Sequence, residues 1–406
     1  MKKTLIAVAA AAALTATSAF AEITFGAWLR VITGVGSNGE DVVMGTTNSW
    51  GGVRPARLNA AGTSEDGKAG FKLDFYFEND EIWGHDHDIR IGDNGYLWVK
   101  PIDQIQLSIG KFDGGETGFR GDFCYGSWNW LRPFNWIADD EGLTFKGSHK
   151  DGLMARITPI DNLVVLVQLP VMNAKWGGNN NGYVAKTETE DAKNTAADVF
   201  KNAAYMASYS IEGVGTLKAG FFGADEEKTV EGKKYNQTGT VNVAFDLNAI
   251  ENLYVTVGAF FDIADKEMGE WHEKMKFTAG ASYQVSDAMK FSVSGGYVKY
   301  MDKCSWLGNK DNAFGIGAGV DYVIMDGLTL NADVRYKNVG YGKKGDDGSV
   351  SFLAGVVKSV GGNASLQAGF QGSTNGCGLV QADTGIPAVE KDDFVWAIPV
   401  GLSVFF

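Results

Sequence analysis

The closing stretch of the chain, residues 394–406, reads FVWAIPVGLSVFF and decides the fold. Every second residue in it is large and apolar: Phe394, Trp396, Ile398, Val400, Leu402, Val404 and Phe406. Successive side chains of a strand point to opposite faces, so this set forms one continuous apolar face. The stretch predicts a β-strand that ends on an aromatic residue.

Interior segments repeat this alternation, but with a polar second face. In 328–337, apolar residues alternate with Thr, Asn, Asp, Arg and Lys, and 71–78, 275–284 and 364–371 follow the same pattern. A soluble β-sandwich also alternates. Segments of about ten residues instead favour a transmembrane barrel over a soluble β protein. Aromatic residues near the expected strand ends would form its interfacial girdles; they are Tyr283, Tyr297, Tyr300, Tyr322 and Tyr336.

Composition agrees with an all-β chain. Of 406 residues, 54 are Gly and only 7 are Pro, and aromatic residues make up 12%. The formal charge of −13 argues against a nucleic-acid-binding protein. With 4 His and 3 Cys, the chain has little material for a zinc scaffold or a disulfide framework. We therefore expect no metal and no cofactor.

Residues 1–21 have the pattern of a secretory signal peptide. Lys2 and Lys3 precede an apolar run over 5–14, and Ala19-Phe20-Ala21 is a small-x-small cleavage site. Glu22 would begin the mature chain, and loss of the two lysines would take its net charge from −13 to −15. Residues 22–406 are predicted to form a single barrel in the outer membrane of a diderm bacterium.

Tight turns alternate with long connections along the mature chain. The long ones are expected at 34–50, 79–93, 112–141, 171–202, 223–236, 262–272, 300–312, 339–348 and 372–393. Short periplasmic turns and long outer loops are typical of outer-membrane barrels. Nine long connections imply an antiparallel barrel of about 18 strands, within a range of 16–20. Residues 142–158 are interpreted as one bulged strand, which preserves the alternation.

Several motifs, in their order along the chain, resemble spirochaete (treponemal) porin-like outer-membrane proteins. They are Phe25-Gly26-Ala27-Trp28, Trp50-Gly51-Gly52, Trp98-Val99-Lys100-Pro101 and Leu107-Ser108-Ile109-Gly110-Lys111. This resemblance implies an outer-membrane barrel with porin or surface-antigen roles and no catalytic residues. The terminal strand is similar to the signal that the barrel-assembly machinery reads in outer-membrane proteins. That signal maps onto Trp396, Ile398, Val400, Leu402, Val404 and Phe406.

A barrel of this size leaves a water-filled lumen. Alternation places Lys72, Asp74, Asp333 and Arg335 on the inner face. Others expected there are Arg30, Glu78, Asp246, Lys276, Lys290 and Asp321. Rings of charge set ion preference in channels, and facing rows of opposite sign would create a transverse field. The plainer interpretation is that these groups are solvated or paired.

Segment 112–141 is the third long connection, and in general porins the third outer loop folds inward and narrows the pore. By similarity we expect the same here. Its Trp128, Trp130 and Trp136, with Arg120 and Arg132, would suit stacking on a sugar or contact with an anion. Alternatively, the segment packs its own aromatic residues against the barrel wall.

Other groupings give weaker signals. His85-Asp86-His87-Asp88 has metal-ligand spacing, but a solvated loop explains it as well. Cys124, Cys304 and Cys377 fall in expected outer loops, and a Cys304–Cys377 bridge is one option. Ser148 and His149 are adjacent and would point to opposite faces of a strand, so we expect no enzyme.

Two functions fit this sequence. One is a porin for passive diffusion of small hydrophilic solutes or ions, and the net charge of −15 hints at weak cation preference. The other is an adhesin or surface antigen whose outer loops, such as 171–202, bind host protein while the barrel is an anchor in outer-membrane lipid. A homotrimer is compatible with either function. Conduction through the lumen separates the two.

Overall fold

The computed structural model describes residues 22–37, 41–47, 56–78, 88–112, 119, 145, 151–171, 195–231, 233–269, 273–304, 309–338, 348–374 and 394–406. Its strands in the first half of the chain are β1 (Glu22–Ser37), β2 (Val42–Thr47), β3 (Ala56–Thr63), β4 (Ala69–Glu78), β5 (Asp88–Ile102), β6 (Ile105–Lys111), β7 (Gly152–Ile160), β8 (Leu163–Leu169) and β9 (Ala204–Ile211). The second half contributes β10 (Gly215–Val230), β11 (Lys233–Leu247), β12 (Leu253–Ala264), β13 (Glu273–Ser286), β14 (Met289–Cys304), β15 (Lys310–Met325), β16 (Leu328–Lys337), β17 (Ser349–Ser359), β18 (Ala364–Ser373) and β19 (Val395–Phe405). Among the described residues, helical structure is limited to α2 (Ala196–Lys201) and the 3-10 turn Lys266–Met268. No helix in these ranges is long and apolar enough to cross a membrane.

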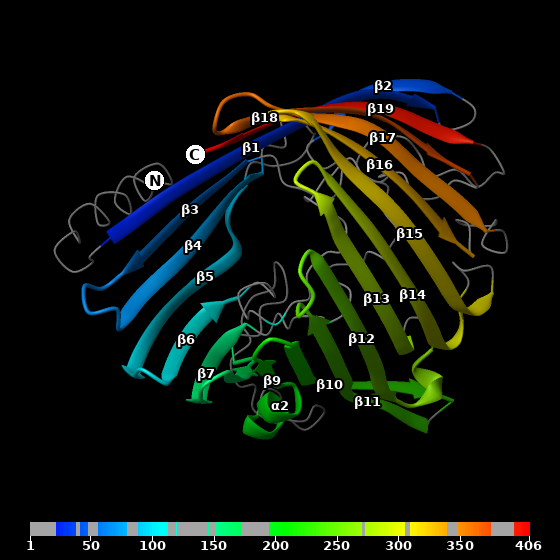
Figure 1. The fold of residues 1–406 in the computed structure, drawn as a ribbon. Helices are drawn as coiled ribbons and strands as arrows, with labels where there is room; N and C mark the ends of the chain where they lie inside the picture. Colours follow the sequence, from blue (N-terminus) through cyan, green and yellow to red (C-terminus); the bar gives the residue numbers. More distant parts are fainter. Residues whose placement is uncertain are drawn as a thin grey trace.

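From β3 to β19 each strand pairs antiparallel with the next, and the sheet closes on itself (Figure 1). The closing seam joins β1 to β19, with Trp28 opposite Phe405 and Ser37 opposite Trp396. On its other edge, β1 pairs first with β3 and then, from Ile32 onward, with β2. Strands β2 and β3 thus occupy one position in the wall, and the described strands form the predicted barrel of 18 positions.

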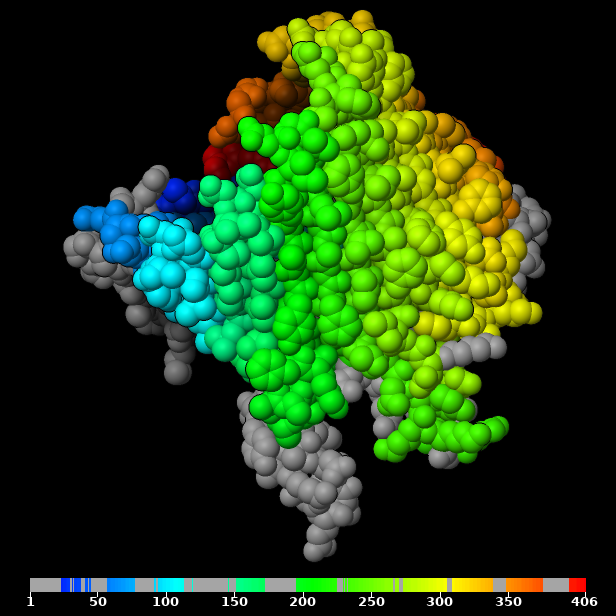
Figure 2. All heavy atoms as spheres, turned by 60° about the horizontal axis from the view of Figure 1, so that its bottom comes forward, coloured from blue at the N-terminus to red at the C-terminus, as the bar shows by residue number. Residues whose placement is uncertain are grey.

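Side chains alternate between the two faces of the wall, as the sequence predicts. On β16, Asn331, Asp333, Arg335 and Lys337 are buried on the inner face, while Val334 is 50% exposed on the outer face. On β19, Ile398, Val400 and Leu402 are all exposed on the outside. The space-filling view in Figure 2 shows the outer face from β6 to β15 as a continuous surface. This outer surface is apolar because it faces lipid rather than water.

Aromatic residues form two rows on the outer face. Tyr283, Phe291 and Tyr322 lie near the short turns, with Tyr283 directly opposite Phe291. The other row lies near the long connections and includes the ring contacts Phe261–Phe277, Phe314–Tyr336 and Phe370–Trp396. Rows at both ends of the apolar band are the girdles expected of a transmembrane barrel. Tyr300 is an exception, because it is buried and only 4% exposed.

Two predicted boundaries are wrong for a common reason. Residues 223–236 were expected to be a loop, but β10 and β11 continue as a paired ribbon to Val230 and Lys233. Similarly, β14 extends to Cys304 and β15 starts at Lys310 within the expected loop 300–312. Polar residues in the sequence predict loops, but the part of a strand that lies beyond the lipid needs no apolar face. Of the strand expected over 142–158, β7 covers 152–158 and Phe145 lies in a bend, while 142–144 and 146–150 lie outside the described residues.

The short turns carry local polar chemistry. In the turn between β3 and β4, the Ser64 hydroxyl donates to the Asp66 carboxylate at 2.6 Å, and the Lys68 backbone N–H donates to the same oxygen at 3.1 Å. These hydrogen bonds, with that of Ser64 first, lower the pKa of Asp66. Gly67 has φ +68° and therefore suits the left-handed position of this turn.

Candidate functional site: the lumen wall

The inner face of the barrel contains polar clusters that bridge neighbouring strands. Asp74 on β4 is fully buried, forms an ion pair with Arg57 on β3, and accepts hydrogen bonds from the Asn94 backbone N–H at 3.1 Å and side-chain amide at 2.8 Å. Arg57 also lies 5.6 Å from the ring centroid of Tyr76, within cation–π range. The Asp74 charge is thereby compensated within the wall.

A second cluster joins β10, β11 and β12. The Lys218 ammonium lies 2.7 Å from the Asp246 carboxylate, and the Thr256 hydroxyl donates to the other oxygen of Asp246 at 2.7 Å. On β15 and β16, the Asn331 amide donates to Asp321. The Lys218–Asp246 ion pair compensates both charges within the wall, and the Asn331 amide supplies a hydrogen bond to the Asp321 carboxylate.

The predicted lumen residues are placed as follows. Lys72, Asp74, Asp333 and Arg335 lie on the inner face, and so do Asp246, Lys276, Lys290 and Asp321. The side chains of Arg30 and Glu78 lie outside the described residues. The sequence-based prediction did not name five further basic residues as lumen residues, although the same alternation assigns each of them to the inner face: Arg57, Lys100, Arg156, Lys218 and Lys337.

Removing the Asp74 carboxylate is expected to destabilise the barrel. Asp74→Leu leaves the Arg57 guanidinium in the wall without its anion, at a cost of about 3 kcal/mol in unfolding free energy. Urea unfolding in lipid vesicles measures this cost. The double variant Asp74→Leu/Arg57→Leu should recover much of the loss, and equal stabilities for Asp74→Leu and the wild type would contradict the assignment.

One sector of the inner wall is apolar. Met154, Leu166, Met206 and Ala244 from β7, β8, β9 and β11 form a buried cluster, together with Ala204. Phe119 and Phe145 belong to the same cluster, with exposures of 1% and 0%. Both come from the long connection between β6 and β7.

The aromatic rings in this cluster form a chain of contacts. Phe119 packs on Phe145 with ring centroids 5.9 Å apart, and Phe145 meets Phe222 edge-on at 6.0 Å. Gly220 on β10 makes room for them, because a Cβ there would lie 3.0 Å from the Phe145 ring. The wall at Gly220 has no side chain, and the Phe145 ring packs against it.

Two glycines mark the points where this connection leaves and rejoins the wall. Gly110 at the end of β6 pairs with Gly152 at the start of β7. Their φ angles of +141° and +142° are unfavourable for other residues, and a Cβ on Gly110 would lie 2.2 Å from the Gly95 carbonyl oxygen. The wall thus requires glycine on both sides of the connection.

The residues singled out within 112–141 have not been tested by the structure. Trp128, Trp130, Arg120 and Arg132 lie outside the described residues, as does His85-Asp86-His87-Asp88. In the described part of the chain, no three His, Cys, Asp or Glu side chains are grouped to hold a metal ion.

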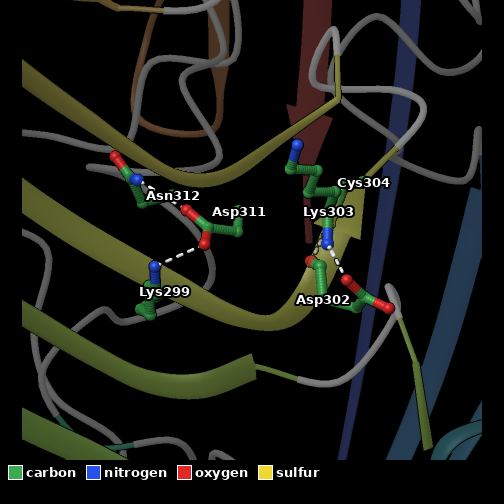
Figure 3. A network of polar contacts seen from close by, with 6 residues as sticks. All are labelled: Lys299, Asp302, Lys303, Cys304, Asp311 and Asn312. Carbon is green, nitrogen blue, oxygen red and sulfur yellow. Dashed lines mark hydrogen bonds and ion pairs between the residues drawn. The ribbon is translucent and has the colours of Figure 1, made fainter. Parts of the chain in front are cut away.

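The rim at the long connections contains a separate polar group, shown in Figure 3. The Lys299 ammonium donates to the Asp311 carboxylate at 2.6 Å, and the Asn312 amide donates to its other oxygen at 2.8 Å. Cys304 lies at the end of β14 and is buried, rather than in a loop as expected. Cys377 lies outside the described ranges, so a bridge between the two stays a prediction.

A closed barrel with an apolar outer band and a polar inner face defines a transmembrane β-barrel protein. Within that class, residues 7–342 match the family model described as Gram-negative porin. The chain belongs to the Gram-negative porin family. The fold and family indicate a channel in the outer membrane rather than an enzyme.

Solved structures agree at the level of the fold. The chain is similar to OmpF of Salmonella typhi, with TM-score 0.52, 7% identity, and coverage of 95% of this chain and 97% of that one. It is also similar to an anion-selective porin from Comamonas acidovorans, with TM-score 0.49, 13% identity, and coverage of 95% of this chain and 99% of that one. A third similar structure is the outer-membrane channel DcaP of Acinetobacter baumannii, with TM-score 0.47, 11% identity, and coverage of 95% of this chain and 97% of that one. Among curated proteins, none matches this chain.

Proposed function

We propose that the mature chain, 22–406, forms an outer-membrane channel for passive diffusion of small hydrophilic solutes and ions, narrowed by the connection between β6 and β7, which includes 112–141. The supporting observation is the buried position of Phe119 and Phe145 against the inner wall. A segment whose aromatic residues pack inside the barrel reduces its bore, while the wall of β12–β19 keeps its polar inner face.

Several narrower assignments belong to this proposal. Residues 1–21 act as a cleaved signal peptide, supported by the basic start, the apolar run and the small-x-small site in their sequence. The barrel-assembly machinery reads the strand that ends at Phe406. The protein assembles as a homotrimer, and it belongs with the spirochaete porin-like proteins that its sequence motifs resemble. The adhesin function is not favoured by the family match.

Conductance tests the channel directly. We expect the refolded mature protein to give stepwise openings in a planar bilayer, with a conductance that rises with salt concentration. Circular dichroism and heat-modifiable gel migration would first establish that the barrel is folded. A folded, inserted barrel that never conducts would overturn the proposal.

A further inference from the structure

The short turns at one end of the barrel contain an excess of acidic residues. These eight turns are 64–68, 103–104, 161–162, 212–214, 248–252, 287–288, 326–327 and 360–363. Their acidic residues are Glu65, Asp66, Asp103, Asp161, Glu212, Glu251, Asp287 and Asp326. With Lys68 as their single basic residue, their net charge is −7. Every second connection of this antiparallel barrel lies at the same end, so the eight carboxylates surround one mouth, and we call them the turn ring.

The carboxylates of the turn ring are exposed and lack a compensating ion pair. All eight side chains are exposed, and within the described residues no ion pair involves any of them. The Lys358 ammonium comes close to the ring, but it donates to the backbone carbonyl of Asp326 at 3.2 Å rather than to the carboxylate. The negative charge of the ring is therefore available to ions in the surrounding water.

Turn geometry alone does not require this charge. Asp, Asn, Ser and Gly all favour turns, and Asn tolerates the left-handed conformation as Asp does. The same turns already use Asn in this way, with φ +66° at Asn162 and +63° at Asn252. A neutral residue would serve the turns equally well, so the excess of carboxylates has a cause beyond the backbone.

The turn ring lies just outside the apolar band of the barrel. Tyr283 and Phe291, in the aromatic row near the short turns, are each four residues from Asp287, and Tyr322 is four residues from Asp326. Aromatic girdles mark the boundary between lipid and water. The carboxylates beyond this row are therefore in water, at the level where the lumen opens.

We propose that the turn ring gives the channel a preference for cations at its short-turn mouth. This inference rests on the proposed channel function. Rings of Asp and Glu favour cations in channels, and fixed charge of one sign raises the local concentration of mobile ions of the opposite sign. Cations that enter from the short-turn side are thus enriched at the mouth, and anions are depleted there.

The ring acts through its summed field rather than by holding an ion at a fixed position. In the part of the chain that the structure describes, no three His, Cys, Asp or Glu side chains are grouped to hold a metal ion. The eight carboxylates are instead distributed over seven separate turns. Sodium and potassium chloride should therefore give the same sign of preference.

Salt concentration determines how far the field of the ring reaches. The screening length is about 10 Å at about 0.1 M ionic strength and about 3 Å at about 1 M. In a gradient of potassium chloride, the ring therefore influences permeation mainly when the dilute chamber faces the short turns. When the concentrated chamber faces them, salt screens the ring.

The experiment uses the full mature barrel in a planar bilayer between dilute and concentrated potassium chloride. The reversal potential gives the ratio of potassium to chloride permeability, and it is measured with the gradient in both directions. A streptavidin-binding peptide inserted between Gly361 and Gly362, in the one described short turn without a carboxylate, identifies which chamber the short turns face. Heat-modifiable gel migration shows that each variant is folded.

Two variants remove the same amount of charge from opposite ends of the barrel. The test variant is Asp103→Asn/Asp161→Asn/Asp287→Asn/Asp326→Asn, which keeps residues that favour turns. The control is Glu231→Gln/Asp265→Asn/Glu267→Gln/Asp302→Asn, which changes exposed residues at the long-connection end.

With the dilute chamber at the short turns, we expect a permeability ratio above one for the wild type and the control. The test variant should lower this ratio toward one in that orientation, and should match the wild type when the gradient is reversed. A wild-type ratio at or below one, or a test variant equal to the wild type, would overturn this inference. An equal loss in both orientations would also contradict an effect at this mouth. Each of these results leaves the channel function intact, whereas a folded barrel that never conducts refutes the channel itself.

Discussion

Phe145→Ala should enlarge the pore and destabilise the barrel. The Phe145 side chain is fully buried between Phe119, Phe222 and the wall at Gly220. Its truncation removes these contacts and leaves a cavity, which costs about 3–5 kcal/mol for a buried Phe. Loss of this anchor should also release the connection between β6 and β7 from the wall. The mean single-channel conductance should therefore rise, and the current through the open channel should fluctuate more.

Two measurements test this prediction together: urea unfolding in vesicles and single-channel recording. Phe145→Leu is the conservative control, because it keeps an apolar side chain on the same patch and should lose less stability. Phe200→Ala is the matched surface control, since Phe200 on α2 is 57% exposed. An unchanged conductance in folded Phe145→Ala would show that Phe145 does not hold the constriction.

Val334→Arg should hinder membrane insertion far more than a similar change inside the lumen. Val334 is 50% exposed on the outer face of β16, between two inward charged residues, Asp333 and Arg335. An Arg on the lipid face costs about 2–4 kcal/mol at the bilayer midplane. By contrast, the arginine at the next position, Arg335, is part of the native inner wall.

The yield of folded protein, measured by heat-modifiable gel migration after refolding into vesicles, reports this cost. Thr329→Arg on the same strand adds an equal charge to the inner face and serves as control, with little expected loss of yield. If both variants insert equally well, the assignment of outer and inner faces to β16 is wrong.

Much of this fold can be read from the sequence, because the bilayer imposes one simple rule on every strand. Residues 328–337 alternate strictly, and the structure places each of them on the predicted face. The rule fails where strands leave the lipid. At 223–236 the outer face is no longer apolar, so a paired ribbon is indistinguishable from a loop in the sequence.

The candidate site is only partly predictable for a different reason. Alternation identifies Asp74 as an inward residue, but its partner Arg57 lies on another strand, and only the register of β3 and β4 brings them together. The environment of Phe145 is even harder to predict from the sequence. Its apolar neighbours suggested a strand, whereas its environment is set by side chains from β7 to β11, which are distant in sequence.

The seam between β1 and β19 has a consequence for biogenesis. It pairs residues near position 30 with residues near position 400, so a growing chain cannot close its barrel until the final strand exists. Every shorter intermediate is an open sheet with two unsatisfied edges, which is a template for aggregation. Export must therefore deliver the whole polypeptide in a protected, unclosed form, and a nonsense mutation even within the last strand should be as damaging as one much earlier.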